Sequence, residues 1–174
     1  MRLAPPPYTE VLFGKMFAPI WQTWFHEVFR KLDEQFVVKQ TDESITNSTT
    51  LQDDDELQVE LAANGAYDIE FFITWASVST TPDVKYQFIE PDGTYELTGI
   101  SNSNGAATAR FGDEGTAAVA LGIGAAGQAW LSGRILAHPS TAGGVFKLQW
   151  SPNAIDAVNP TICEANSWMR ARKL

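Results

Sequence analysis

Few residues in this chain have side chains that catalyse reactions at neutral pH. The 174 residues contain two histidines, His26 and His138, and one cysteine, Cys163. A single cysteine excludes a disulfide framework within the chain and any metal site built from several cysteines. Neither histidine lies beside a serine in a nucleophile-elbow motif, and Cys163 lies in the apolar segment PTIC, which is typical of a small core residue. The sequence therefore predicts a protein that is not an enzyme.

Residues 122–127, GIGAAG, match the glycine pattern of a dinucleotide-binding loop. In such a loop the glycines let a pyrophosphate approach the N-terminus of the helix that follows. Here the next residues, QAWLSG, look like a strand, and no acidic residue lies about twenty positions further on to bind a ribose. We therefore interpret the segment as a hairpin loop rich in glycine and alanine, and we predict no cofactor.

The densest group of charges is DDDE at residues 53–56. Its alternate carboxylates, Asp53 and Asp55, are candidate Ca²⁺ ligands, because Ca²⁺ takes several oxygen ligands. The glycine and the distal glutamate of an EF-hand loop are missing. The alternative is a solvated turn ahead of a strand at Leu57, in which an aspartate accepts hydrogen bonds from its own backbone.

Overall charge and hydropathy narrow the possible partners. The 21 acidic and 12 basic residues give a formal net charge of -9, which repels a phosphate backbone, so we predict no nucleic-acid partner. Between Asp42 and Glu96 there are thirteen acidic residues and one basic residue, Lys85. No segment reaches the ~18 consecutive apolar residues of a membrane helix, and the first residues lack the apolar segment of a signal peptide. We expect a protein that is made in a cytoplasm and not inserted into a membrane.

Residues 1–19 combine prolines with large apolar side chains. The proline run favours an extended conformation that cannot fold on itself. Extended segments with many apolar groups usually lie on a surface, either that of the same chain or that of a partner. The candidate docking residues are Pro5, Pro6, Pro7, Tyr8, Leu12, Phe13 and Phe17.

Residues 20–34 have the pattern of one short helix. Pro19 suits a helix start, because its missing N–H has no partner in the first turn. The apolar residues recur at spacings of four, three and four, which places them on one face, and a further tryptophan widens that face. So broad an aromatic surface packs either on a domain or on copies of itself around a symmetry axis. The candidate oligomerisation residues are Trp21, Trp24, Phe25, Val28 and Leu32.

From residue 35 onward the apolar period changes from that of a helix to two, which is typical of strands. Turn sequences separate the alternating segments, among them NG at 64–65, PDG at 91–93 and GG at 143–144. Eight to ten strands without helices between them predict that residues 35–174 form one antiparallel β-sandwich. We expect a jelly-roll-like arrangement in preference to an immunoglobulin-like one.

Tryptophan faces can stack on sugars, and the chain has six tryptophans. Trp75 and Trp150 alternate in step with apolar neighbours, which predicts that they lie in the core. Trp130 and Trp168 remain as candidate exposed platforms for a carbohydrate.

Five segments, taken together, resemble a known class of protein. They read PIWQTWFHEVF at residues 19–29, TNSTTLQDDDEL at 46–57, AANGAY at 62–67, LQWS at 148–151 and SWMRA at 167–171. The first, with the proline run before it, resembles the N-terminus of small virion proteins of tailed bacteriophages. The other four resemble a β domain that recurs in such proteins.

This resemblance implies a structural part of a virion rather than a catalyst. We expect a homotrimeric tail or neck appendage, a short fibre. Residues 1–19 would dock it on other virion proteins, residues 20–34 would trimerise it, and the jelly-roll-like domain would project outward. One alternative is a capsid-decorating (cement) protein. Another is an adhesin that binds a host-surface glycan through Trp130 or Trp168.

Overall fold

The computed structural model describes residues 34–79, 83–90, 93–102, 119–121 and 127–174, together with Trp24, Val28 and Ile123. The predicted docking arm, residues 1–19, lies outside the described residues. Trp21, Phe25 and Leu32 of the predicted helix do so as well. Within the described part, no helix is long and apolar enough to cross a membrane.

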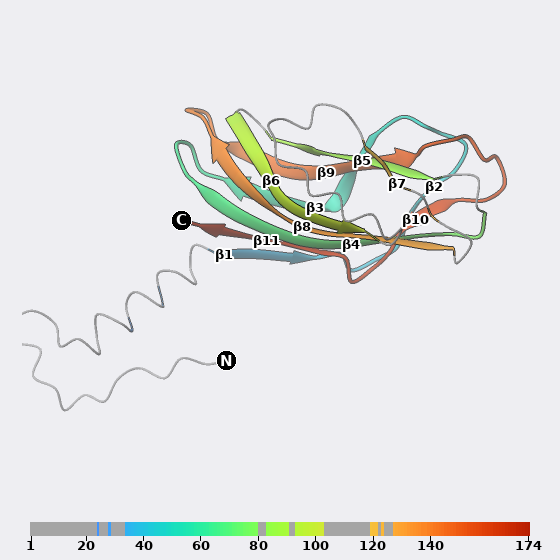
Figure 1. Cartoon of the computed structure of the whole chain (residues 1–174), viewed down its shortest axis with the longest axis horizontal. Coiled ribbons are helices and arrows are strands. Elements are labelled where there is room, and N and C mark those ends of the chain that lie inside the picture. The colour runs from blue at the N-terminus through green and yellow to red at the C-terminus, as the bar shows by residue number, and fades with distance from the viewer. Residues whose placement is uncertain are drawn as a thin grey trace, which may run out of the picture.

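The described chain forms two antiparallel sheets that face each other (Figure 1). The central strand of the first sheet is β4, which pairs with β11 and β10 along one edge and with β8 along the other. The first sheet consists of β1 (Glu34–Val38), β11 (Trp168–Lys173), β4 (Tyr67–Ser77), β10 (Thr161–Cys163), β2 (Glu43–Ile45), β8 (Gln128–Pro139) and β6 (Gly93–Asn102). The second sheet consists of β3 (Gln52–Leu61), β9 (Gly144–Pro152), β5 (Val84–Ile89) and β7 (Val119–Leu121). The prediction of a mainly β, antiparallel fold is confirmed.

The core lies between the sheets and follows the alternation of each strand. From β4, Ile69, Phe71, Ile73 and Trp75 are at most 1% exposed. Aromatic rings connect the two sheets, as shown by Phe71 and Phe88, whose ring centroids are 4.7 Å apart. Burial of each large side chain stabilises the fold by roughly 1.5–3 kcal/mol.

Both tryptophans that were predicted to lie in the core do so. Trp75 in β4 and Trp150 in β9 are fully buried. Trp75 stacks on Tyr86 of β5 in the opposite sheet, with their ring centroids 5.9 Å apart. The two tryptophans thus contribute to the same core from opposite sheets.

A side chain links the two sheets where β1 and β3 lie at their edges. Gln35 in β1 accepts a hydrogen bond from the Glu60 N–H at 2.9 Å and donates one to the Glu60 carbonyl. The amide therefore satisfies both backbone groups of one residue on an edge strand, which would otherwise be open to pairing with another chain.

The acidic segment at residues 53–56 is part of strand β3 and not a solvated turn. The pairing of β3 with β9 changes register between Asp53 and Gln58. At this irregularity Asp54 turns inward and is 1% exposed, where it accepts hydrogen bonds from the backbone N–H groups of Glu56 at 3.0 Å and Leu57 at 2.8 Å. The expected aspartate-to-backbone bonding is present, but it stabilises a buried bulge.

The two ends of the sandwich carry different parts of the chain (Figure 1). The C-terminus and the start of β1 lie at one end, and the loop between β9 and β10 lies at the other. Ile155 and Val158 in that loop are 63% and 81% exposed. If the residues before β1 attach the chain to a partner, the loop between β9 and β10 lies at the end of the sandwich farther from that partner.

Candidate binding surface

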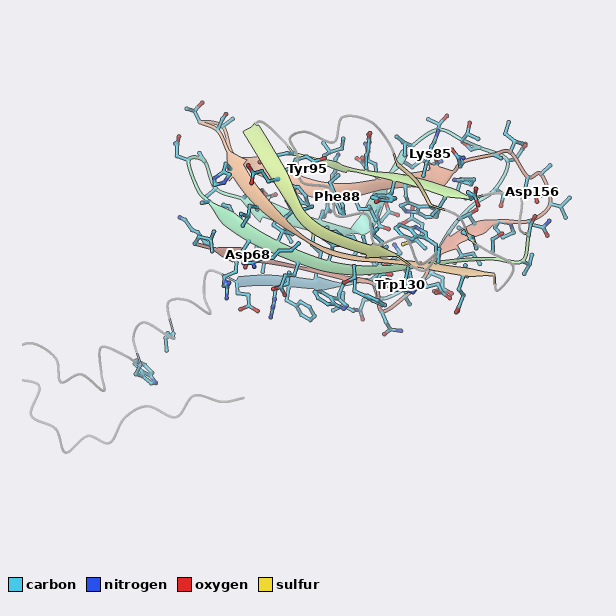
Figure 2. The ribbon with its side chains drawn as sticks, in the orientation of Figure 1. Asp68, Lys85, Phe88, Tyr95, Trp130 and Asp156 are labelled. Carbon is cyan, nitrogen blue, oxygen red and sulfur yellow. The ribbon has the colours of Figure 1, made fainter. Side chains whose placement is uncertain are left out.

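The outer face of the first sheet carries a row of aromatic side chains, which we call the aromatic band. Its members are Phe36 of β1, Trp168 of β11, Phe72 of β4 and Trp130 of β8. Since side chains alternate along each strand, these four lie opposite the residues that form the core. Figure 2 shows Trp130 on the side of the first sheet that faces away from the second.

The rings of the aromatic band contact one another across the strands. The ring centroids of Phe36 and Trp168 are 5.9 Å apart, and those of Phe72 and Trp130 are 6.3 Å apart with nearly parallel planes. Trp168 and Phe72 are direct partners in the β11–β4 pairing, which joins the two ring pairs into one band. Phe36 is 59% exposed, and the other three rings are partly buried.

An ion-pair network, which we call the arginine network, lies next to the aromatic band on the same face. Asp68 of β4 forms ion pairs with Arg134 of β8 and with Arg172 of β11, the latter at 2.8 Å. Arg170 of β11 forms ion pairs with Glu70 of β4 and, at 3.9 Å, with Glu34 of β1. The strand register places Arg170 between Phe36 and Glu70, so charged and aromatic rows are adjacent.

Asp68 is the buried centre of this network. Its side chain is 3% exposed, whereas those of Arg134 and Arg172 are 51% and 36% exposed. Burial alone would raise the pKa of Asp68, but the hydrogen bonds and charges of Arg134 and Arg172 outweigh it and hold that pKa below its usual value. The carboxylate therefore stays charged and orients both guanidinium groups on the surface.

The chemistry of this face is that of binding. Aromatic rings and arginines are the side chains that protein interfaces concentrate at their centres. Ring faces stack on apolar groups, on sugars and on other rings, and a guanidinium group carries several N–H donors in one plane. The surface therefore has the composition of a contact site for a macromolecule or a carbohydrate.

The structure does not bring together ligands for a metal around the predicted acidic pair. Asp53 accepts hydrogen bonds from Lys147 and Gln149, both at 2.5 Å, which lower the pKa of its carboxyl. Asp55 is exposed on the same side of β3, and Asp54 between them faces the core. Within the described ranges, no group of three or more His, Cys, Asp and Glu side chains is arranged to hold a metal ion.

The structure also describes two other residues of reactive type, Cys163 and His138. Cys163 is fully buried, and burial raises the pKa of its thiol well above the usual value. His138 is exposed near the end of β8, while His26 lies outside the described residues. Of the glycine-rich segment only Ile123 and Gly127 are described, and the Gly127 carbonyl accepts a hydrogen bond from the Ser77 N–H at 2.9 Å.

Two features were not predicted from the sequence. The first is the place of Phe36 and Phe72 in the aromatic band. Phe71 and Phe72 are adjacent, and alternation requires one of two neighbouring side chains to face outward, so this signal was present in the sequence. The second is a buried lysine, Lys39, between Asp54 and Glu43. No spacing rule predicts it, because it depends on the bulge in β3.

The chain was also compared with known proteins. No protein-family model matches it, and no curated protein matches it with significant sequence similarity.

The arginine network makes the stability of the fold depend on pH. Because the folded-state pKa of Asp68 lies below its unfolded value, its contribution is fully present above about pH 5 and is lost as pH falls through the folded-state value. We expect Asp68→Asn to lower the free energy of unfolding by about 1–2 kcal/mol at pH 7. That difference should shrink below pH 4.

Urea unfolding of both proteins between pH 2 and pH 8 measures this. Glu60→Gln, which removes an exposed carboxylate from β3, is the control and should change stability by less than about 0.5 kcal/mol. A deficit in Asp68→Asn that stays constant down to pH 2 would contradict the assignment.

Proposed function

We propose that this chain is a structural component of a tailed-bacteriophage particle, a homotrimeric appendage of the tail or neck. The observation that carries the proposal is the aromatic band, which leaves four aromatic side chains on one outer face of a single chain. The resemblance of the sequence to small virion proteins supports the same assignment. In this arrangement the band is a contact between copies, and residues 1–19 dock the trimer on other virion proteins.

The order of the strands supports a jelly-roll-like domain. The first sheet contains the run β1-β11-β4-β8 and the second the run β3-β9-β5-β7. Each sheet thus combines strands from the first and second halves of the domain, as two interlocked Greek keys do. Each sheet of such a sandwich has one outward face, and the aromatic band lies on that of the first sheet.

Charge balance makes this face suitable for contact between identical chains. The whole chain has a formal net charge of -9, so most of its surfaces repel a second copy. The arginine network holds three arginines against three carboxylates, so it has no net charge. Three copies can therefore turn this face toward a common axis without opposing like charges, while the rings of the band exclude water between them.

The predicted helix at residues 20–34 would add a second contact between copies. Trp24 and Val28, four residues apart, have helical backbones and are partly buried. Three such helices around a common axis would cover one another's apolar faces. The start of β1 at one end of the sandwich supports this arrangement, since the helices would then extend from the end nearest the particle (Figure 1).

Light scattering tests the oligomeric state. We expect the full chain to have the mass of a trimer. Phe36→Ser should raise the concentration at which that trimer dissociates at least about tenfold. This is about a hundredfold change in the trimer dissociation constant, or about 2.8 kcal/mol per trimer, because the midpoint concentration varies with the square root of that constant. Val158→Ser, at a residue 81% exposed in the loop between β9 and β10, is the control and should leave dissociation unchanged. A stable monomer at high concentration would contradict the trimer.

Deletion of residues 1–19 distinguishes the appendage from a capsid-decorating protein. We expect the shortened chain to remain trimeric, because the proposed contacts between copies lie in the helix and the aromatic band. It should no longer copurify with particles in an assembly assay, because the docking arm is gone. If the shortened trimer still decorates empty heads, the capsid-decorating alternative is favoured.

A host-surface adhesin is the second candidate function. The observation that favours it is the near-parallel pair of Phe72 and Trp130 on the outer face, with an interplanar angle of 22°. A flat aromatic surface of this kind stacks on the C–H face of a sugar ring. On a glycan array, the adhesin predicts at least one bound glycan for the wild-type chain and loss of that binding in Trp130→Ala. An array without binders would remove this candidate.

A further inference from the structure

Lys39 is a buried lysine whose ammonium group lies between two carboxylates, those of Asp54 and Glu43. Its side chain is 1% exposed, its Nζ lies 3.0 Å from Asp54 Oδ2, and the Asp54 side chain is fully buried. The same Nζ lies 2.9 Å from Glu43 Oε2, whose side chain is 20% exposed. We propose that this triad forms a covalent isopeptide bond between Lys39 Nζ and Asp54 Cγ, with Glu43 transferring the protons.

The reacting atoms are already close to the required separation. Lys39 Nζ is 3.1 Å from Asp54 Oδ1 and 3.0 Å from Oδ2. Because Nζ lies within 3.1 Å of both oxygens, its separation from the Cγ that carries them is no more than about 3.5 Å, the outer limit of a near-attack separation. Both side chains are buried, so solvent has little access to the pair.

The bulge in β3 supplies hydrogen-bond donors for the negative charge that develops during the attack. The N–H groups of Leu57 and Glu56 donate to Asp54 Oδ1 at 2.8 and 3.0 Å. Trp150 Nε1 donates to Oδ2 at 3.3 Å. Fixed donors aimed at an oxygen that becomes an oxyanion are the largest source of rate acceleration in acyl transfer. The two donors to Oδ1, the oxygen that becomes the oxyanion, are backbone N–H groups and cannot rotate away, whereas Trp150 donates to Oδ2, the oxygen that leaves.

Glu43 is the group that can take a proton from Lys39. Burial raises its pKa, and the charge of Asp54 raises it further, although the hydrogen bond from Lys39 acts in the opposite direction. A raised pKa makes Glu43 a stronger base than an exposed glutamate. Burial lowers the pKa of Lys39, but hydrogen bonds to Glu43 and Asp54 outweigh this and raise it, so the reaction starts from the ammonium form and depends on Glu43.

The step balances without any other reactant. Glu43 removes a proton from the Lys39 ammonium, and the nitrogen lone pair forms a bond to Asp54 Cγ. The tetrahedral intermediate collapses as the bond from Cγ to Oδ2 breaks. Two protons from Nζ, each carried by Glu43, leave with that oxygen as one water molecule. The products are a secondary amide, water and an unchanged Glu43.

Burial favours the amide over the ion pair. Taking two charges out of water costs several kcal/mol for each ion, and an amide that replaces them carries no charge. Exclusion of water from the site also limits the reverse reaction, hydrolysis of the new bond. Burial therefore makes the ion pair costly and favours the amide that forms from it.

Mass spectrometry of the intact, denatured full-length chain tests the proposal. The expected mass is lower than the sequence mass by one water molecule, and digestion should yield a branched peptide that joins Lys39 to Asp54. Lys39→Arg keeps the positive charge but cannot form this bond, so it should have its full sequence mass. Glu43→Gln should retain the ion pair between Lys39 and Asp54. It should slow the loss of water at least tenfold, because Glu43 carries the protons.

Lys147→Arg is the matched control. Lys147 of β9 lies 2.5 Å from Asp53 of β3, but the Asp53 side chain is 48% exposed and that of Lys147 is 26% exposed, so water competes for both. This variant should lose one water molecule as the wild type does. A wild-type chain that keeps its full mass after prolonged incubation would overturn the proposal and leave an ionised triad. Loss of water that persists in Lys39→Arg would also overturn it. Neither result bears on the oligomeric state or on particle assembly.

Discussion

The alternation of side chains along β4 is the constraint on which the rest of the structure depends. This strand pairs with β11 and β10 on one edge and with β8 on the other, so it holds the first sheet together. Its inward residues form the centre of the core, and its outward residues include Phe72 and Glu70. A one-residue shift in the pairing of β4 would exchange its inward and outward side chains. The core and the binding surface are therefore determined by the same register.

An interruption of the alternation in β3 creates the second unusual feature. In β3 the register changes between Asp53 and Gln58, and the bulge turns Asp54 into the interior. A carboxylate there needs partners, because an unpaired buried charge is very costly. Lys39, two backbone N–H groups and Trp150 supply them. The result is a buried charged site beside the apolar core of the sandwich.

Much of the architecture could be predicted because it depends on local patterns. The period of two predicted an antiparallel fold, and the apolar neighbours of Trp75 and Trp150 predicted their burial. The prediction of a solvated turn at residues 53–56 was wrong, because alternating exposed aspartates look the same whether they precede a strand or belong to one. Trp130 and Trp168 were predicted as surface residues. They form one band with Phe36 and Phe72 because of the order of the strands in the sheet, and no local sequence pattern predicts that order.

The sequence alone therefore determines which residues can face the core, since side-chain alternation is a property of each strand by itself. It also accounts for the scarcity of catalytic side chains, which is a matter of composition. Tertiary structure decides which strands become neighbours, and so places Phe36 of β1 beside Trp168 of β11 and Lys39 beside Asp54. These contacts join residues from 15 to 132 positions apart (54 − 39 = 15, 168 − 36 = 132), so they exist only once the sheets have assembled. The free energy that selects them comes from burying both sheet faces at once.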